Sequence, residues 1–204
     1  MNQTEKTDTI RLSDQQILQA FVDSKALQKG HFHLTSGRHS DTYIQCARVL
    51  EQPRLTIALA RETIARLPAG TAVDMVASPA VGGILFGFAV ASILDKNLIF
   101  SERVEGRMHL RRSFALAPQY RVLIAEDVVT TGGSVRELIA LVEEAKAEVV
   151  SVVALIDRGS KPDFGYPYYP LLTLEAPSWS PQECKLCQNG KKLQSPGSRS
   201  LAKR

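Results

Sequence analysis

The chain has 204 residues, 44% of them hydrophobic and 23% charged, and its 25 basic residues against 21 acidic ones leave a formal net charge of +4. This length suits one α/β domain with small additions, and the composition is that of an ordinary globular protein. The basic excess is modest and lies partly in the last residues. Nucleic-acid binding is therefore poorly supported, whereas a basic site for small polyanions fits equally well.

The three cysteines, Cys46, Cys184 and Cys187, provide no disulfide framework and suit a reducing compartment. The start of the chain is polar and lacks the apolar core of a signal peptide. The longest mainly apolar stretch, 77–94, is interrupted by one proline and three glycines, which indicates a loop and a buried helix rather than a membrane span. We therefore expect a cytoplasmic protein without a membrane span.

The first thirty residues predict a loose leader and one helix. Residues 1–12 have the polarity of an unpacked terminus. Ser13 and Asp14 can cap a helix that runs through Ala26, with an apolar face. Gly30 is expected to stop this helix.

A hairpin is predicted over residues 31–45, with its turn at Ser36 and Gly37. His31 and His33 flank an apolar residue, a spacing that favours a hairpin over a metal site.

Helices and strands alternate from residue 53 to residue 156, the pattern of a doubly wound, mostly parallel α/β sheet. Between two of the strands, residues 102–112 are charged and predict a mobile loop or an extended hairpin. The expected helices cover 53–67, 83–94 and 134–146, and the expected strands cover 73–77, 98–101, 121–125, 148–156 and 171–174.

The segment 122–134 is the most informative part of the chain. A buried strand is predicted to end at Ala125, and Glu126 and Asp127 follow it before a Thr-Thr-Gly-Gly-Ser turn that opens a helix. Glycines, hydroxyls and successive N–H groups at such a turn can surround a phosphate. An ordinary strand–turn–helix explains the glycines but not two acids at a strand end, and those acids are better placed for sugar hydroxyls or a metal-bound diphosphate.

This pattern resembles the phosphoribosyl diphosphate signature of type I phosphoribosyltransferases. The resemblance implies that fold, with a mostly parallel doubly wound sheet and a small N-terminal hood. It also implies that the signature binds the donor, 5-phosphoribosyl 1-diphosphate, through Glu126, Asp127, Val128, Val129, Thr130, Thr131, Gly132, Gly133 and Ser134.

Two further segments resemble the acceptor side of orotate phosphoribosyltransferases. Residues 34–43 resemble their hood segment, in which a Ser-Gly-Arg run, here ending at Arg38, and a following aromatic residue, here Tyr43, line the base pocket. Arg158 stands where the family pairs an arginine with the orotate carboxylate, and Thr130 lies beside it. Taken alone, these segments also fit a plain β-turn and a surface Asp-Arg turn.

Two other segments resemble the parts of the family that contact diphosphate. Residues 78–84 resemble the diphosphate-binding loop, but Val81 and Gly82 stand where many members carry an aromatic residue and a lysine. Any contact must then come from backbone N–H groups, and a simple helix-entry turn is an equally good interpretation. The charged segment resembles the mobile catalytic loop, which implies donor-binding roles for Arg103, Arg107 and His109. Val104 replaces a common lysine there, and a solvated charged face is the alternative.

Together the resemblances imply an enzyme of pyrimidine (UMP) biosynthesis that converts orotate and 5-phosphoribosyl 1-diphosphate into orotidine 5′-phosphate and diphosphate. Catalytic roles would fall to Arg107, His109 and Asp127. Mg²⁺ is expected through the diphosphate and ribose hydroxyls, with no protein metal ligand, and a homodimer would share the mobile loop. We expect one domain over 1–204, with a helix and hood in 1–50, an α/β core in 53–160 and a tail in 161–204.

Two rival functions share parts of this pattern. A purine phosphoribosyltransferase, for adenine or xanthine, would have the same signature but would need no carboxylate partner such as Arg158. A regulatory protein with the same fold would have lost catalytic groups, and the lysines missing at Gly82 and Val104 are the best support for it.

The pair Cys184-x-x-Cys187 supplies only two of the four ligands that a structural zinc needs. No second pair in the chain has the right spacing, although two copies across a dimer could complete a site. We expect reduced surface thiols.

Overall fold

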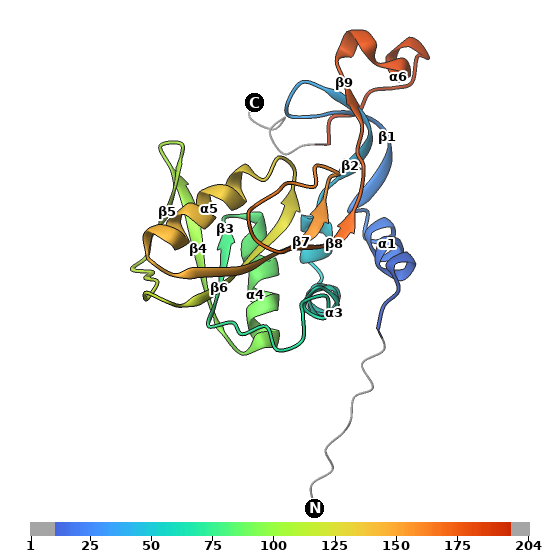
Figure 1. The fold of residues 1–204 in the computed structure, drawn as a ribbon. Coiled ribbons are helices and arrows are strands. Elements are labelled where there is room, and N and C mark those ends of the chain that lie inside the picture. The colour runs from blue at the N-terminus through green and yellow to red at the C-terminus, as the bar shows by residue number, and fades with distance from the viewer. Residues whose placement is uncertain (1–10, 197–204) are drawn as a thin grey trace, which may run out of the picture.

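The computed structural model describes residues 11–196 (Figure 1). The expected leader, residues 1–12, lies almost wholly outside that range. The strands are β1 Leu27–His33, β2 His39–Ile44, β3 Met75–Pro79, β4 Asn97–Val104, β5 Arg107–Leu110, β6 Arg121–Val129, β7 Glu148–Asp157, β8 Tyr168–Thr173 and β9 Ser178–Trp179. The helices are α1 Asp14–Asp23, α2 Ala47–Leu50, α3 Pro53–Ile64, α4 Gly82–Leu94, α5 Gly133–Glu144, the 3₁₀ turn η1 Pro181–Glu183 and α6 Lys185–Gln188.

The central sheet has the strand order β5-β4-β3-β6-β7-β8. All neighbours in it are parallel except β5, which pairs antiparallel with β4 at one edge. Helix α5 covers one face, and α3 and α4 cover the other. The predicted doubly wound, mostly parallel α/β fold is confirmed.

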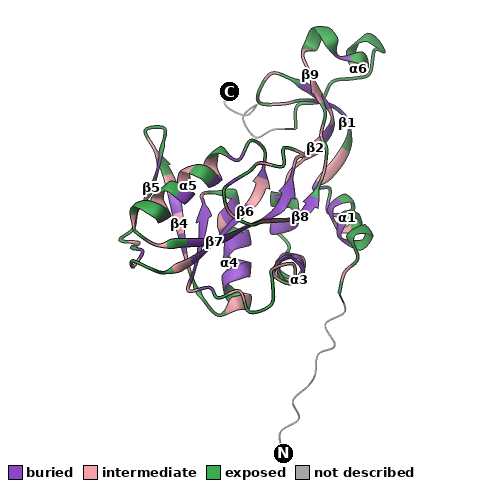
Figure 2. Ribbon diagram, viewed as in Figure 1, coloured by how far each residue is buried: buried purple, intermediate pink, exposed green. Residues whose placement is uncertain are grey.

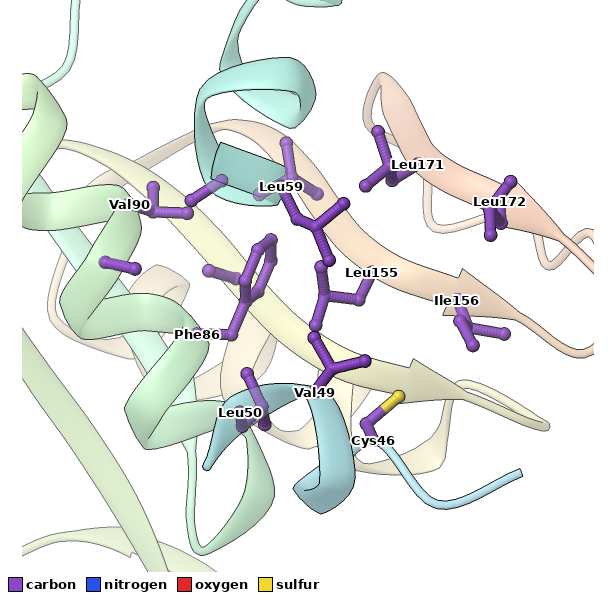
Figure 3. Packing of buried hydrophobic residues seen from close by; sticks show 14 of the residues in the cluster. Cys46, Val49, Leu50, Leu59, Phe86, Val90, Leu155, Ile156, Leu171 and Leu172 are labelled. Atoms are coloured by element: carbon purple, nitrogen blue, oxygen red, sulfur yellow. The ribbon is translucent and has the colours of Figure 1, made fainter. Parts of the chain in front are cut away.

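The alternation of side chains along each strand builds two cores, one on each face of the central sheet. From β6, Leu123 packs in the cluster that contains Phe86 and Leu59, whereas its neighbour Ile124 packs in the cluster that contains Leu138. Figure 3 shows Phe86 and Leu59 within the first of these cores. The central strands are buried on both faces, as the purple ribbon of Figure 2 shows. They give the site at their carboxyl ends a rigid base.

Strand β6 is longer than predicted. It runs past Ala125 to Val129, because its pairing with β7 continues to the Val129–Asp157 pair. Glu126 and Asp127 therefore lie within the strand, near the carboxyl end of the β6–β7 ladder, and not in the loop that follows.

The start of the chain confirms one boundary and corrects another. Ser13 caps α1 through a reciprocal capping box, as expected of its residue type. The helix ends at Asp23, before Lys25 takes a left-handed conformation with φ 60°. Gly30 does not stop this helix and lies inside β1 instead. A Cβ at Gly30 would lie 2.6 Å from the ring of Phe32, so the glycine makes room for that buried ring.

The charged segment 102–112 forms the extended hairpin of β4 and β5, which confirms one of the two predicted alternatives. Strand β3 begins two residues later than expected, and α3 ends three residues earlier. In the tail, β9 was not predicted. It pairs with β2, so the hood is a three-stranded sheet of order β1-β2-β9 (Figure 1). Among residues 11–196, no helix is long and apolar enough to cross a membrane.

Candidate active site

The Thr-Thr-Gly-Gly-Ser turn between β6 and α5 forms the floor of a pocket of about 200 Å³. Gly132 caps α5 with a left-handed φ of 79°. The first N–H groups of a helix have no partner within the helix, and its dipole favours an anion at that end. The pocket is lined by Arg103, Glu126, Val128, Val129, Thr130, Thr131, Gly132, Gly133, Ser134, Val135 and Glu137. The pocket therefore offers a phosphate group the donors that the sequence predicted.

Contacts with Arg136 and Phe164 hold the turn in this conformation. Arg136 donates to the carbonyl oxygens of Thr131 (2.7 Å) and Asp163 (3.0 Å), and its guanidinium lies 5.2 Å from the ring centre of Phe164. A Cβ at Gly132 would lie 2.7 Å from the same ring. Arg136 was not predicted as a site residue from the sequence. An arginine in the first turn of a helix has no distinctive pattern until Phe164, far along the chain, is seen to pack on it.

The two acids lie directly under the glycine-bearing loop before α4. Glu126 is 7% exposed, and its Oε1 accepts a 3.0 Å hydrogen bond from the backbone N–H of Asp127. Burial, reinforced by the charge of Asp127, raises the pKa of Glu126 to about 9. A Cβ at Gly82 would lie 2.4 Å from Oδ2 of Asp127, and one at Gly83 would lie 3.0 Å from Oε1 of Glu126. Any side chain at Gly82, including a lysine, would displace Asp127, which gives a physical reason for the departure from the family pattern.

A second cavity of about 450 Å³ adjoins the first, and Thr130 lines both. The hood contributes Tyr43 and Ser36 to its wall, and the core contributes Thr130 and Arg158. Tyr43 is partly buried, which raises the pKa of its phenol. The full lining is His33, Leu34, Thr35, Ser36, Tyr43, Ile44, Thr130 and Arg158. The fold thus brings the predicted acceptor residues Tyr43, Thr130 and Arg158 together, although they are far apart in the sequence.

Arg158 is held at this cavity by its backbone. Its N–H donates to the carbonyl of Val129 (2.9 Å), and the buried carboxylate of Asp157 accepts from the N–H of Ser160 (2.9 Å) in the turn that follows. Within residues 11–196, Nε of Arg158 is buried and has no hydrogen-bond partner. Burial also lowers the pKa of this arginine, because its charge has lost solvent. A planar carboxylate in the cavity would provide both the charge and the acceptors.

The predicted lid residues lie in different places. Arg103 reaches the phosphate pocket and donates to Oε1 of Glu137 at 2.6 Å, a contact that raises the pKa of Arg103 and lowers that of Glu137. Arg107 and His109 lie exposed on β5 and line neither cavity. Arg38 also lies outside the base cavity, because its Nε donates to the hydroxyl of Ser178 in β9 at 2.9 Å. The expectation for Arg38 is corrected by a tail strand that the sequence did not predict.

The parallel sheet, the phosphate turn at its carboxyl edge and the adjoining cavity define a type I phosphoribosyltransferase. The family model described as "Phosphoribosyl transferase domain" matches residues 47–180. The chain is 47% identical over 190 residues, 92% of its own length and 100% of the relative's, to a protein of Heliobacterium modesticaldum named "Orotate phosphoribosyltransferase". The chain belongs to the orotate phosphoribosyltransferase family.

Solved structures agree on the fold. Orotate phosphoribosyltransferase from Aeropyrum pernix superposes with a TM-score of 0.65 at 23% identity, covering 78% of this chain and 94% of that one. Adenine phosphoribosyltransferase from Rhodothermus marinus superposes with a TM-score of 0.62 at 22% identity, covering 77% and 99%. Since enzymes named for two different bases match almost equally well, the fold alone does not choose the acceptor.

Proposed function

We propose that the protein transfers the 5-phosphoribosyl group from 5-phosphoribosyl 1-diphosphate to orotate, giving orotidine 5′-phosphate and diphosphate in pyrimidine biosynthesis. The observation that carries this proposal is the pair of adjoining cavities that share Thr130. The phosphate turn lies in one cavity, and the other holds Arg158, whose buried Nε has no hydrogen-bond partner among residues 11–196. The name of the closely similar relative supports the same acceptor.

The donor would occupy the first cavity. Its 5′-phosphate would accept hydrogen bonds from the N–H groups and hydroxyls of Thr130–Ser134, at the start of α5. Glu126 and Asp127 would accept hydrogen bonds from the ribose 2′- and 3′-hydroxyls. This arrangement fixes the ribose at both ends and leaves C1 free to move toward the base.

Orotate would occupy the second cavity. Its carboxylate would pair with the guanidinium of Arg158, and the partly buried ring of Tyr43 would contact the pyrimidine. A neutral purine would leave the Arg158 charge unpartnered in the cavity. The cost of that unpaired charge favours orotate over adenine.

The electrostatics of the acids suit the chemical step. As the bond between C1 and diphosphate lengthens, positive charge grows on the ribose ring. Burial disfavours the ionised form of Glu126 in the free protein. A cation developing nearby stabilises that ionised form, so this interaction is stronger in the transition state than in the ground state.

The residues at the site fit the Mg²⁺ that the family resemblance implies. Mg²⁺ binds oxygen ligands and keeps several waters, so it is held by one or two carboxylates together with substrate phosphates. Here the diphosphate and the ribose hydroxyls, which Glu126 and Asp127 would hold beside the loop at Gly82, would supply such oxygens, so no protein ligand to the ion is needed. Bound with the donor, Mg²⁺ would neutralise charge on the diphosphate leaving group.

We further propose a homodimer in which the β4–β5 hairpin closes the neighbouring subunit's site. Two observations support it. Arg107 and His109 lie outside both cavities of their own chain, and Val81, Leu85 and Phe88 form an exposed apolar face at the start of α4. In this arrangement Arg107 and His109 would contact the diphosphate and exclude water from the cationic ribose.

Mixed dimers test the shared loop. Subunits carrying Arg107→Ala and subunits carrying Asp127→Asn would each be inactive alone. Random mixing would restore one intact site in half of the dimers, or about a quarter of full activity. No recovery, in dimers shown to have exchanged subunits, would contradict loop sharing.

The three cysteines are all free, and we propose a reducing cytoplasm as the location.

The acceptor itself is tested with purified protein, 5-phosphoribosyl 1-diphosphate and Mg²⁺. Orotate absorbance should fall, whereas adenine, xanthine and uracil should be consumed slowly or not at all. Consumption of adenine in preference to orotate would support the purine alternative, and consumption of no base would support a regulatory protein.

A further inference from the structure

Two histidines of the hood and the two cysteines of the tail meet in one cluster outside the substrate cavities. His31, His39, Cys184 and Cys187 each present a nitrogen or sulfur atom, and these four atoms all lie within 4.8 Å of one another. The shortest contacts are His31 Nε2 to His39 Nδ1, 3.2 Å; His39 Nδ1 to Cys187 Sγ, 3.2 Å; Cys184 Sγ to His31 Nε2, 3.4 Å; and Cys187 Sγ to His31 Nε2, 3.6 Å.

The cluster corrects the expectation of two surface thiols. Cys184 is 0% exposed, and only Cys187 lies at the surface. The hairpin at His31 is confirmed, but that histidine also joins the cluster. The Cys-x-x-Cys spacing was visible in the sequence. The second pair of ligands was not, because His31 and His39 come from two strands that become neighbours only when β1 and β2 pair.

The local backbone structure brings the histidine and cysteine side chains of the cluster together. His33 pairs with His39 across β1 and β2. The ring centres of His31 and His33 lie 5.1 Å and 5.7 Å from that of His39, so the three histidines lie together in the hood sheet. Cys184 and Cys187 are brought to one side by a tight turn in which Cys187 N–H donates to Cys184 O at 3.0 Å. Figure 1 shows this tail segment, with β9 and α6, beside β1 and β2.

An outer contact fixes the orientation of His31. Its Nδ1 lies 2.7 Å from the carbonyl oxygen of Lys191, which makes Nδ1 the protonated nitrogen and leaves Nε2 with a lone pair. That lone pair faces His39 Nδ1 and both cysteine sulfurs. It can accept one hydrogen bond, so hydrogen bonding alone does not account for three polar neighbours. A histidine that donates to a backbone carbonyl through one nitrogen and points the other at a metal is the usual arrangement of a metal ligand.

The distances match tetrahedral zinc. Bonds of about 2.3 Å to sulfur and about 2.0–2.1 Å to nitrogen place two tetrahedral nitrogen ligands about 3.3 Å apart, and a nitrogen and a sulfur about 3.6 Å apart. The nitrogen–nitrogen separation is 3.2 Å and the nitrogen–sulfur separations are 3.2–3.6 Å, so all four lie within about 0.4 Å of the tetrahedral values. Two thiolates and two imidazoles are a common structural zinc set, whereas Mg²⁺ and Ca²⁺ prefer oxygen.

We propose that His31, His39, Cys184 and Cys187 bind one structural Zn²⁺ ion, which joins the tail to the hood within a single chain. All four positions are filled by protein, so this ion has no place for substrate or water. Its effect is mechanical. It holds the β1–β2 hairpin, which carries Tyr43 and Ser36 of the base cavity, against the segment that follows β9.

The metal content of the full chain tests this site. Protein expressed with zinc in the medium and dialysed without chelator should hold about one zinc per chain. Cys187→Ser and His39→Gln should each reduce this to less than about a tenth. Cys46→Ser and His33→Ala are matched controls, since they remove the same residue types outside the four ligands, and should retain the metal. Cys187 is exposed, so its substitution should leave the fold intact even if a Cys184 variant fails to fold.

Two further measurements distinguish zinc coordination from a cluster held by hydrogen bonds or by a disulfide. Cobalt substituted for zinc should give the intense visible bands of tetrahedral thiolate coordination, and these should disappear in Cys187→Ser. A strong chelator should expose the tail after residue 180 to proteolysis. The proposal is overturned by wild-type protein that holds only traces of zinc, by a Cys184–Cys187 disulfide in protein purified under reducing conditions, or by zinc that Cys187→Ser retains.

Discussion

Replacing Arg158 by glutamine removes the guanidinium from the base cavity while keeping a polar side chain. Its Nε is buried without a partner among residues 11–196, and burial lowers its pKa, so this charge is poorly solvated in the free protein. Truncating one member of a desolvated, hydrogen-bonded charge pair costs about 2–5 kcal/mol, and each 1.36 kcal/mol is a factor of ten. We therefore expect Arg158→Gln to lower kcat/KM for orotate by about 30- to 5000-fold.

The assay compares orotate with uracil, which lacks the carboxylate. The variant should lose discrimination between these two bases, because only orotate uses the guanidinium. The KM for 5-phosphoribosyl 1-diphosphate should change little, since the phosphate turn is intact. Arg48→Gln is the matched control, because it removes an exposed arginine whose i,i+3 pair with Glu51 is worth at most about 1 kcal/mol. An Arg158→Gln enzyme within about threefold of wild type, with orotate still preferred to uracil, would refute the acceptor assignment.

Three other substitutions probe the donor side. Burial raises the pKa of Glu126 from 4.5 to about 9, so the free energy of unfolding of the wild type should fall as pH rises between these values, and Glu126→Gln should remove this loss. Denaturant midpoints across pH measure the effect, and a variant no more stable than wild type at pH 8 would count against it. Gly82→Ala should push Asp127 aside and raise the KM for 5-phosphoribosyl 1-diphosphate by about tenfold or more; an unchanged KM contradicts this. Arg107→Ala should slow turnover about 100- to 1000-fold with an unchanged melting temperature. Near-normal turnover would contradict the assignment of Arg107 to the catalytic loop.

The sequence predicted the central sheet well because its signals are local. The alternation of apolar runs with amphipathic segments located every parallel strand and all three of its covering helices to within a few residues. The glycines and hydroxyls of Thr130–Ser134 predicted the phosphate-binding turn for the same reason, because these residues are adjacent in the sequence. The end of β6 was misplaced at Ala125, because the two acids look like loop residues until pairing with β7 keeps them in the ladder.

The parts that sequence reasoning missed depend on contacts between distant segments. Arg38 was expected at the base and instead binds Ser178, 140 residues away, on a two-residue strand too short to have a periodic pattern. The unusual Gly82 became understandable only when Asp127 was found where its side chain would be. The Cys-x-x-Cys pair lacked partners for the same reason, since its neighbouring histidines lie about 150 residues earlier.

The most direct test of the proposed reaction is the stoichiometry of its products. Purified protein is mixed with equal amounts of orotate and 5-phosphoribosyl 1-diphosphate in the presence of Mg²⁺, and both products are identified by mass spectrometry and a diphosphate assay. We predict one orotidine 5′-phosphate and one diphosphate for each orotate consumed, and almost no product with Asp127→Asn. Diphosphate release without a nucleotide product, or release that does not depend on orotate, would contradict phosphoribosyl transfer to this base.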